Sequence, residues 1–408
     1  MPHFLRRLFL SLVAAAASAG IAAEAVVLAR IHSDPQLPAG RLALFVAVII
    51  SVATFVKAFR TIEWGGENKV RRSERGPQLR GRRTISVVGA IVCFLSWAGS
   101  ALAQGYMVSG NQILDPNGNV YYIHGVDRAS YEYSRTGDGH FTQTDFDNIA
   151  AWKANTVRIA TNQSYLLSDS PCYDPNYLSR LDAAVTAANN DGLNVIFDLH
   201  WNDAGDPTVC ANGQKNMADT RSLTFWQILA DHFMDNPTVF FGLYNEPHGI
   251  TWDCWLNGCD NWVGMQQLYD TVRNEGFANL VIIGGLNFAY DLSGVPTHRV
   301  CGWNIVYATH PYDFSDKQPP DWPRAFGFLT MTDPVVATEF GEFDCSTPYV
   351  QAALDYFDAP DGDISRRMGW TAWAWNSPGS CGFPSIIADW NGTPSAMGQV
   401  EYERLQTY

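Results

Sequence analysis

Two glutamate residues each follow a short apolar run, where an unpaired charge would be costly. Glu246 lies in Gly-Leu-Tyr-Asn-Glu-Pro, and Glu339 lies in Val-Val-Ala-Thr-Glu-Phe-Gly-Glu. Hydrolysis of a glycosidic bond needs one carboxylic acid that protonates the leaving oxygen and one carboxylate that acts opposite it. A single glutamate of this kind could simply cap a strand or pair with an arginine. Two in equivalent positions predict a catalytic pair.

Other polar and aromatic residues follow apolar runs in the same way. Arg158, which keeps its charge, could hold Glu339 ionised and oriented, and Tyr312 could donate a hydrogen bond to the same carboxylate. We expect the pKa of Glu246 to be raised near the charge of Glu339, so that it can act as an acid. The remaining candidates are His200, Asn245 and His310 as polar groups, Trp373 and Trp201 as flat faces for a sugar ring, and Trp375 more weakly.

Four further acidic residues lie at or near strand ends: Asp127, Asp198, Asp203 and Glu342. We interpret them as structural or supporting residues. Asp198 precedes His200 by two positions, shares its face of the strand and lies deeper, where it could orient that histidine or Arg158.

The elements that must position these side chains form an alternating pattern. Amphipathic intervals, such as Leu178 to Asn190 and Trp262 to Glu275, separate eight β-rich runs. Eight repeats of strand and helix predict a (β/α)8 barrel, in which the carboxyl ends of the strands carry the chemistry. The runs are Val120 to Val126, Thr156 to Ala160, Asn194 to Leu199, Val239 to Tyr244, Leu280 to Gly284, Ile305 to Thr309, Val335 to Glu339 and Gly369 to Trp375.

A hairpin is predicted ahead of the barrel. Residues Met107 to Tyr122 alternate around Pro116-Asn117-Gly118, which is a turn signal. We expect this hairpin to plug the bottom of the barrel.

The first 103 residues form a separate N-terminal region. Residues 1–104 hold 13 basic and 5 acidic residues, whereas residues 105–408 hold 14 and 36. The positive-inside bias around three apolar stretches predicts a membrane anchor that leaves residues 104–408 outside the cytoplasm. A signal peptide cleaved near Ala103 is the alternative, and both interpretations export the barrel. The stretches are Leu8 to Leu28, Leu42 to Phe59 and Ile85 to Ala103.

The acidic charge of the globular part argues against nucleic acid as a partner, because it cannot neutralise phosphates. Seven of the eight cysteines lie in this part, which fits disulfide formation outside the cytoplasm. Cys254 and Cys259 are close enough to pair across a loop, Cys172 with Cys210 is a guess, and the odd count leaves one thiol free. No cysteine or histidine spacing indicates a structural metal, and we expect no metal and no cofactor.

From Gly105 to Tyr408 the sequence resembles glycoside hydrolase family 5, the cellulase-type family of retaining β-glycanases. The most specific element is Asn245-Glu246-Pro247. The resemblance implies that Glu246 is the acid/base, that Asn245 binds the sugar 2-hydroxyl and that Glu339 is the nucleophile. It further implies site roles for Arg158 in Val-Arg-Ile, His200 in Asp-Leu-His-Trp, His310 and Tyr312 in His-Pro-Tyr, and Trp373 as a sugar platform.

The family acts on several β-glycans, so the substrate is less certain than the reaction. We expect an endo-β-1,4-glucanase that acts as a monomer on a β-linked polysaccharide or oligosaccharide, with β-mannan or another β-glucan as alternatives. A metal-dependent hydrolase would need a His-x-His pair in the first strand, where only His124 occurs. An inactive, membrane-anchored glycan-binding protein would keep the aromatic cleft without needing both glutamates.

Overall fold

The computed structural model describes residues 105–344, 346–377 and 383–408. The three apolar N-terminal stretches lie outside these residues, so the predicted anchor or signal peptide stays a prediction. Within the described ranges, no helix has the length and apolar character needed to span a bilayer.

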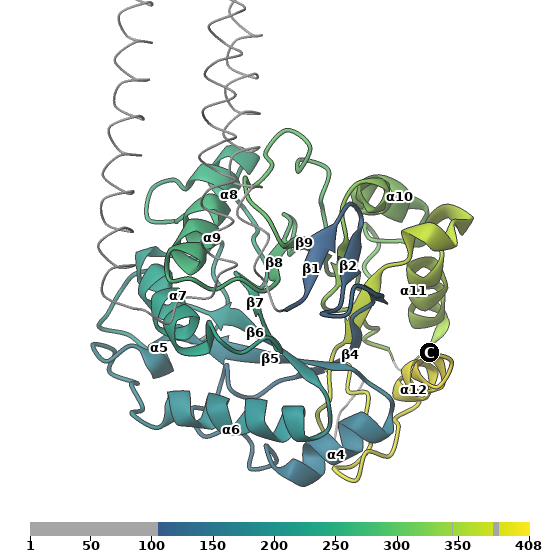
Figure 1. Ribbon diagram of the computed structural model, residues 1–408, viewed down its shortest axis with the longest axis horizontal. Helices are drawn as coiled ribbons and strands as arrows, with labels where there is room; N and C mark the ends of the chain where they lie inside the picture. The colour runs from purple at the N-terminus through teal and green to yellow at the C-terminus, as the bar shows by residue number, and fades with distance from the viewer. Residues whose placement is uncertain (1–104, 345, 378–382) are drawn as a thin grey trace, which may run out of the picture. The chain divides into compact units, whose positions relative to one another are not determined.

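Eight parallel strands close into a barrel, as predicted (Figure 1). Their order around the barrel is β10-β11-β4-β5-β6-β7-β8-β9, and each neighbouring pair is parallel. Nearly every strand residue is buried, because side chains fill the inside and helices cover the outside. The strands are β4 (His124–Arg128), β5 (Thr156–Asn162), β6 (Asn194–Trp201), β7 (Val239–Gly242), β8 (Val281–Gly284), β9 (Ile305–Thr309), β10 (Val335–Ala337) and β11 (Gly369–Ala372).

Helices surround the strands (Figure 1). Their apolar residues are spaced at three and four positions and pack against the barrel, as Leu181, Val185 and Ala188 do in α6. The α-helices are α4 (Gln143–Ala151), α5 (Gln163–Leu166), α6 (Tyr177–Asn190), α7 (Thr220–Phe233), α8 (Trp252–Asn257), α9 (Met265–Asn274), α10 (Trp322–Ala325), α11 (Pro348–Asp358) and α12 (Gly398–Leu405). The short 3-10 helices are η2 (Pro319–Asp321), η3 (Gly327–Met331), η4 (Pro360–Gly362) and η5 (Ile364–Arg366).

A small antiparallel sheet precedes the barrel and covers its bottom. It consists of β1 (Met107–Ser109), β2 (Gln112–Leu114) and β3 (Val120–Tyr121). Ile113 packs with residues such as Phe240 inside the barrel. The side-chain amide of Asn194, at the start of β6, donates hydrogen bonds to the hydroxyls of Tyr106 and Tyr121 at 2.9 and 2.8 Å. The predicted plug is therefore confirmed, with three strands instead of one hairpin.

Two predictions about the elements are wrong. The run Val120 to Val126 is not one strand, because it divides between β3 of the small sheet and β4 of the barrel. The interval between β8 and β9, residues 285–304, is fully described and contains no helix. This interval instead begins with a left-handed turn, in which Asn287, Phe288 and Ala289 have φ values of 55°, 59° and 57°.

Two of the expected disulfides are present. Cys172 is bonded to Cys210, and Cys254 is bonded to Cys259. None of the cysteines that the structure describes is free, so the predicted unpaired thiol is not among them. Cys345 and Cys381 lie outside the described residues.

Candidate active site

The predicted site residues converge at the carboxyl ends of the barrel strands. Arg158 lies in β5 and His200 and Trp201 lie in β6, whereas the other residues follow their strands by one to four positions. All of them except Arg158 and His310 line a cleft of about 540 Å³. The residues that line it are His200, Trp201, Gln214, Asn245, Glu246, Asn287, Phe288, Tyr312, Phe314, Asp316, Lys317, Glu339, Phe343, Trp373, Phe383 and Pro384.

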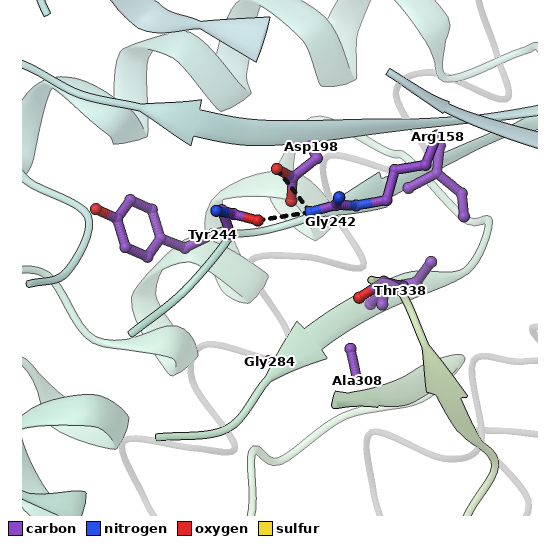
Figure 2. Close-up of a pocket in the computed structure, with 10 residues that line it drawn as sticks. Arg158, Asp198, Gly242, Tyr244, Gly284, Ala308 and Thr338 are labelled. Carbon is purple, nitrogen blue, oxygen red and sulfur yellow. Dashed lines mark hydrogen bonds and ion pairs between the residues drawn. The ribbon is translucent and has the colours of Figure 1, made fainter. Parts of the chain in front are cut away.

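Arg158 is the buried centre of the polar network below the cleft. Its guanidinium contacts the carboxylates of Glu339 at 2.8 Å, Asp198 at 2.9 Å and Asp127 at 3.0 Å. It also donates a 2.7 Å hydrogen bond to the amide oxygen of Asn245. Figure 2 shows the pairing with Asp198. One cation in β5 thus fixes residues from four other strands, and the predicted contact between Arg158 and Glu339 is confirmed.

Burial and the charge of Arg158 shift the pKa values of two carboxyl groups beside it in opposite directions. Burial raises the pKa of Asp127 well above its ordinary value, although the charge of Arg158 opposes the rise. Burial also acts to raise the pKa of Asp198, but Arg158 and His200 outweigh it and leave that pKa lowered. The charged form of Asp198 is therefore favoured beside Arg158, whereas burial favours the protonated form of Asp127.

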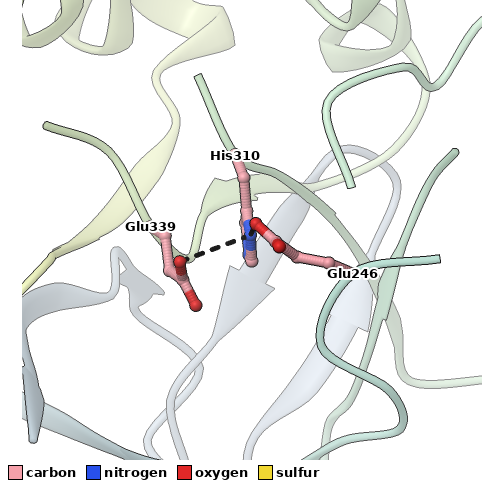
Figure 3. Close-up of side chains that lie close together, drawn as sticks. All are labelled: Glu246, His310 and Glu339. Atoms are coloured by element: carbon pink, nitrogen blue, oxygen red, sulfur yellow. Dashed lines mark hydrogen bonds and ion pairs between the residues drawn. The ribbon is translucent and has the colours of Figure 1, made fainter. Parts of the chain in front are cut away.

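Glu246 and Glu339 face each other across the cleft, with His310 beside them (Figure 3). One carboxylate oxygen of each glutamate and a ring nitrogen of His310 all lie within 4.8 Å of one another. Glu339 Oε2 accepts a 2.8 Å hydrogen bond from the hydroxyl of Tyr312, as predicted. His310 Nδ1 lies 3.0 Å from Glu246 Oε1, and its Nε2 lies 2.8 Å from the hydroxyl of Thr338.

The pKa of Glu246 differs from the prediction. Burial acts to raise it, but the hydrogen bond and the charge of His310 outweigh burial, so the pKa is lowered. The expected rise is therefore wrong for the free chain. The cause is a partner that follows β9, two strands along the barrel from β7: His310 lies 64 residues away in sequence, and its contact with Glu246 could not be predicted from either strand alone.

His200 is held between Asp198 and the aromatic face of Trp373. Its Nδ1 lies 3.0 Å from Asp198 Oδ2, and its ring stacks on Trp373 with 5.3 Å between centroids and 11° between planes. Burial acts to lower the pKa of His200, but the hydrogen bond and the charge of Asp198 outweigh it and raise the pKa to about 9. His200 is therefore a cation at neutral pH, and its stacking on Trp373 fixes the orientation of that ring.

The structure separates the other candidates clearly. Trp201 lines the cleft, whereas Trp375 is fully buried and donates a 2.9 Å hydrogen bond to Asp145. Trp375 is therefore a core residue. Asp203 contacts Arg221 at 3.0 Å, and Glu342 accepts a 2.7 Å hydrogen bond from the backbone of Val350 in the first turn of α11. Both acidic residues are structural, as expected.

Several residues that line the cleft escaped the sequence analysis. Gln214 accepts a 2.9 Å hydrogen bond from the side chain of Asn245. Phe288, Phe314 and Lys317 come from the loops after β8 and β9. Phe288 belongs to the left-handed turn, which costs non-glycine residues roughly 1–2 kcal/mol each. A run of three such residues beside a cleft is a signal of function that only the structure reveals.

Oxygen and nitrogen atoms of Glu246, His310 and Glu339 also have the spacing of metal ligands. These atoms are already engaged, however. Both oxygens of Glu339 are bound, by Arg158 and Tyr312, and His310 Nδ1 contacts Glu246. The cations Arg158 and His200 lie close by and oppose another positive charge. We therefore assign these donors to acid–base and nucleophilic chemistry.

A closed parallel barrel that presents two carboxylates to one cleft defines a class of protein. The fold and the site are those of a glycoside hydrolase that uses a pair of carboxyl groups. The comparison with protein families agrees, because the model of the cellulase family, glycosyl hydrolase family 5, matches residues 115–379. The chain belongs to this family.

Individual relatives are distant. The chain is 24% identical over 323 residues to Endoglucanase E-5 of Thermobifida fusca. The aligned region covers 74% of this chain and 63% of that protein. It is 30% identical over 217 residues to a manganese-dependent endoglucanase of Phanerodontia chrysosporium. This aligned region covers 50% of this chain and 52% of that protein. The chain thus spans between half and two thirds of their lengths. A solved β-glucanase from Saccharophagus degradans has the same fold, with a TM-score of 0.61, 23% identity and coverage of 74% and 93%.

Proposed function

We propose that the protein is a retaining endo-β-1,4-glucanase, with Glu339 as nucleophile and Glu246 as acid/base. The observation that carries this proposal is the separation of at most 4.8 Å between one oxygen of each carboxylate. Retaining enzymes hold their carboxyl groups about 5–5.5 Å apart, whereas inverting enzymes need about 6.5–9.5 Å to admit a water molecule. The relatives named as endoglucanases support the choice of a β-glucan.

In the first step, Glu339 attacks the anomeric carbon and the bond to the leaving oxygen breaks. Arg158 and Tyr312 bind opposite oxygens of Glu339, which keeps the carboxylate oriented toward the sugar. Glu246 gives its proton to the leaving oxygen, so the departing sugar leaves as an alcohol. The product of this step is a sugar covalently bound to Glu339.

Glu246 must be protonated when it acts in this step, and its side chain contacts His310 at 3.0 Å. In the free chain the contact with His310 lowers the pKa of Glu246. A bound glycan removes water from the partly exposed Glu246, which disfavours its carboxylate and favours the protonated acid. Substrate binding thereby prepares the acid.

In the second step, Glu246 acts as a base. It takes a proton from a water molecule, whose oxygen attacks the anomeric carbon and releases Glu339. Two displacements on the same carbon return the original configuration. Asn245 is fixed by Arg158 and Gln214, and its side-chain amide is available for the hydroxyl next to the reacting carbon.

A β-mannan is the second candidate substrate. A mannan endo-1,4-beta-mannosidase of Cellvibrio japonicus is 21% identical to this chain over 334 residues. The endoglucanases include more similar relatives, so we place β-1,4-glucan first.

We further propose that the barrel acts outside the cytoplasm as a monomer, either anchored by the N-terminal region or released by cleavage near Ala103. The two disulfides support an oxidising compartment. Detection of the N-terminus by sequencing the mature protein would separate the two forms, and a chain that stays in the cytoplasm would contradict both.

The full-length chain should be assayed on soluble β-1,4-glucan, mixed-linkage glucan, β-mannan and xylan. We expect activity on β-1,4-glucan that falls by at least a thousandfold in Glu246→Gln and Glu339→Gln. The matched control is Glu403→Gln, which removes the same charge from an exposed position on α12. Binding of glucan without hydrolysis by the wild-type protein would instead support the glycan-binding alternative.

A further inference from the structure

Lys317 is a nearly buried lysine whose ammonium group reaches the catalytic cleft. Only 4% of the residue is exposed, although it follows β9 in a surface loop. Among the described residues, its Nζ donates a hydrogen bond to the backbone oxygen of Asn287, at 3.1 Å. An ammonium group has three donors, so further donors are available to a molecule in the cleft.

Aromatic rings surround this ammonium. Its Nζ lies 5.2 Å from the ring centre of Tyr290 and 5.7 Å from those of Phe288 and Phe314. Phe288 and Phe314 are 41% and 47% exposed and line the cleft with Lys317. Exposed aromatic faces beside a polar donor are suited to a sugar, which offers an apolar ring face and a rim of hydroxyl groups.

The charged groups near Lys317 are acidic. Burial lowers its pKa, whereas the charges of Glu246, Asp316 and Glu339 act to raise it. Glu246 has the largest effect of the three. The ammonium therefore lies within the electrostatic reach of both catalytic glutamates, and it is poorly solvated before substrate arrives.

The barrel order places Lys317 on the side of the nucleophile away from Trp373. Glu339 follows β10, which lies between β9 and β11. Trp373 follows β11, while Lys317 and Phe314 follow β9. If Trp373 supports the sugar that becomes attached to Glu339, the sugar on the other side of the broken bond faces Lys317.

We propose that Lys317 determines specificity for the leaving-group sugar. Its ammonium donates hydrogen bonds to hydroxyl groups of that sugar, and Phe288 and Phe314 contact the sugar ring. The left-handed turn at residues 287–289 serves this arrangement, because it directs the oxygen of Asn287 to Lys317 and exposes the ring of Phe288. This inference rests on the proposed glucanase function.

The test compares two substrates that differ only in the leaving group. When cellotriose is cleaved to cellobiose and glucose, the leaving group is a sugar that carries hydroxyl groups. The leaving group of 4-nitrophenyl β-cellobioside is 4-nitrophenol, which has no sugar hydroxyl groups. In the full-length Lys317→Met variant we expect kcat/KM for cellotriose to fall about tenfold or more, the effect of losing a hydrogen bond to a charged donor. The value for the nitrophenyl substrate should change by less than about twofold. Lys153→Met is the matched control, because Lys153 also bonds a backbone oxygen, that of Gln406, but lies outside the cleft.

The outcomes separate this inference from the proposed function. Hydrolysis of neither substrate by the wild-type protein would refute the glucanase itself. An equal fall on both substrates in Lys317→Met, or a shifted alkaline limb of the pH profile, would show that Lys317 acts through Glu246 or the loop and would overturn the inference. No change on either substrate would also overturn it. If Lys317→Met does not fold, Lys317→Gln, which keeps a hydrogen-bond donor, should show a smaller fall confined to cellotriose.

Discussion

The contact between Asp198 and His200 makes a quantitative prediction about the substitution Asp198→Asn. Asp198 Oδ2 lies 3.0 Å from His200 Nδ1, and its hydrogen bond and charge are the main influences that raise the pKa of the histidine. Asparagine keeps the shape of the side chain and removes the charge. We therefore expect the pKa of His200 to fall from about 9 to about 7 or below.

The magnitude follows from the pKa values. A rise from 6.5 to about 9 corresponds to about 3 kcal/mol in favour of the charged ring. Because the pKa in the folded state is raised, this contribution to the free energy of unfolding is complete below about pH 6.5 and is lost as the pH rises through about 9. In Asp198→Asn most of this contribution should be absent at neutral pH.

Nuclear magnetic resonance of histidine-labelled protein measures the titration directly, with His200→Gln to assign the signal. Asp182→Asn is the matched control, because Asp182 contacts a different histidine, His232, at the surface. A wild-type pKa near 6.5, or a value that stays near 9 in Asp198→Asn, would refute the reasoning.

Three further predictions concern Tyr312, the removal of metal ions and Glu401. Tyr312→Phe removes the hydroxyl that donates a hydrogen bond to Glu339 and should lower kcat about tenfold to a hundredfold. Unfolding experiments should show that the variant is folded. An unchanged kcat would show that this hydrogen bond does not contribute to catalysis. Treatment with a chelator should leave activity within about twofold of that of the untreated protein, because the atoms that could bind a metal already contact protein groups. A loss of activity that Mn²⁺ restores would contradict this prediction. Glu401 is fully buried, its carboxylate oxygens have no hydrogen-bond partner among the described residues, and burial raises its pKa from 4.5 to about 8. The folded state holds a proton that the unfolded state releases between these values, so stability falls as the pH rises. Glu401→Gln should therefore raise the free energy of unfolding by up to about 4 kcal/mol near pH 8 and by little below pH 4.5, and a gain independent of pH would contradict this cause.

The alternation of elements and the polar residues at strand ends predicted the barrel and most of the site. Arg158 and Tyr312 both contact Glu339 because parallel strands bring their carboxyl ends to one face, whatever the sequence between them. Strand boundaries were less predictable. The run after Val120 has a continuous β pattern, yet it changes sheet between Tyr121 and His124.

The loops could not be predicted, because long-range contacts set their conformations. The turn at residues 287–289 contains no glycine, and Lys317 binds it from 30 residues away in sequence. The lowered pKa of Glu246 has the same origin, since it depends on His310 from another strand. Neither contact leaves a local pattern in the sequence.

The most direct test of the proposed mechanism is to trap the covalent intermediate in the full-length protein. A cellobiosyl fluoride that carries fluorine in place of the 2-hydroxyl slows the release of the sugar from the nucleophile, and mass spectrometry then locates the adduct. We predict one fluorocellobiosyl group on the peptide that contains Glu339. Turnover of the reagent without an adduct, or an adduct on another residue such as Glu246, would contradict the assignment of Glu339 as the nucleophile.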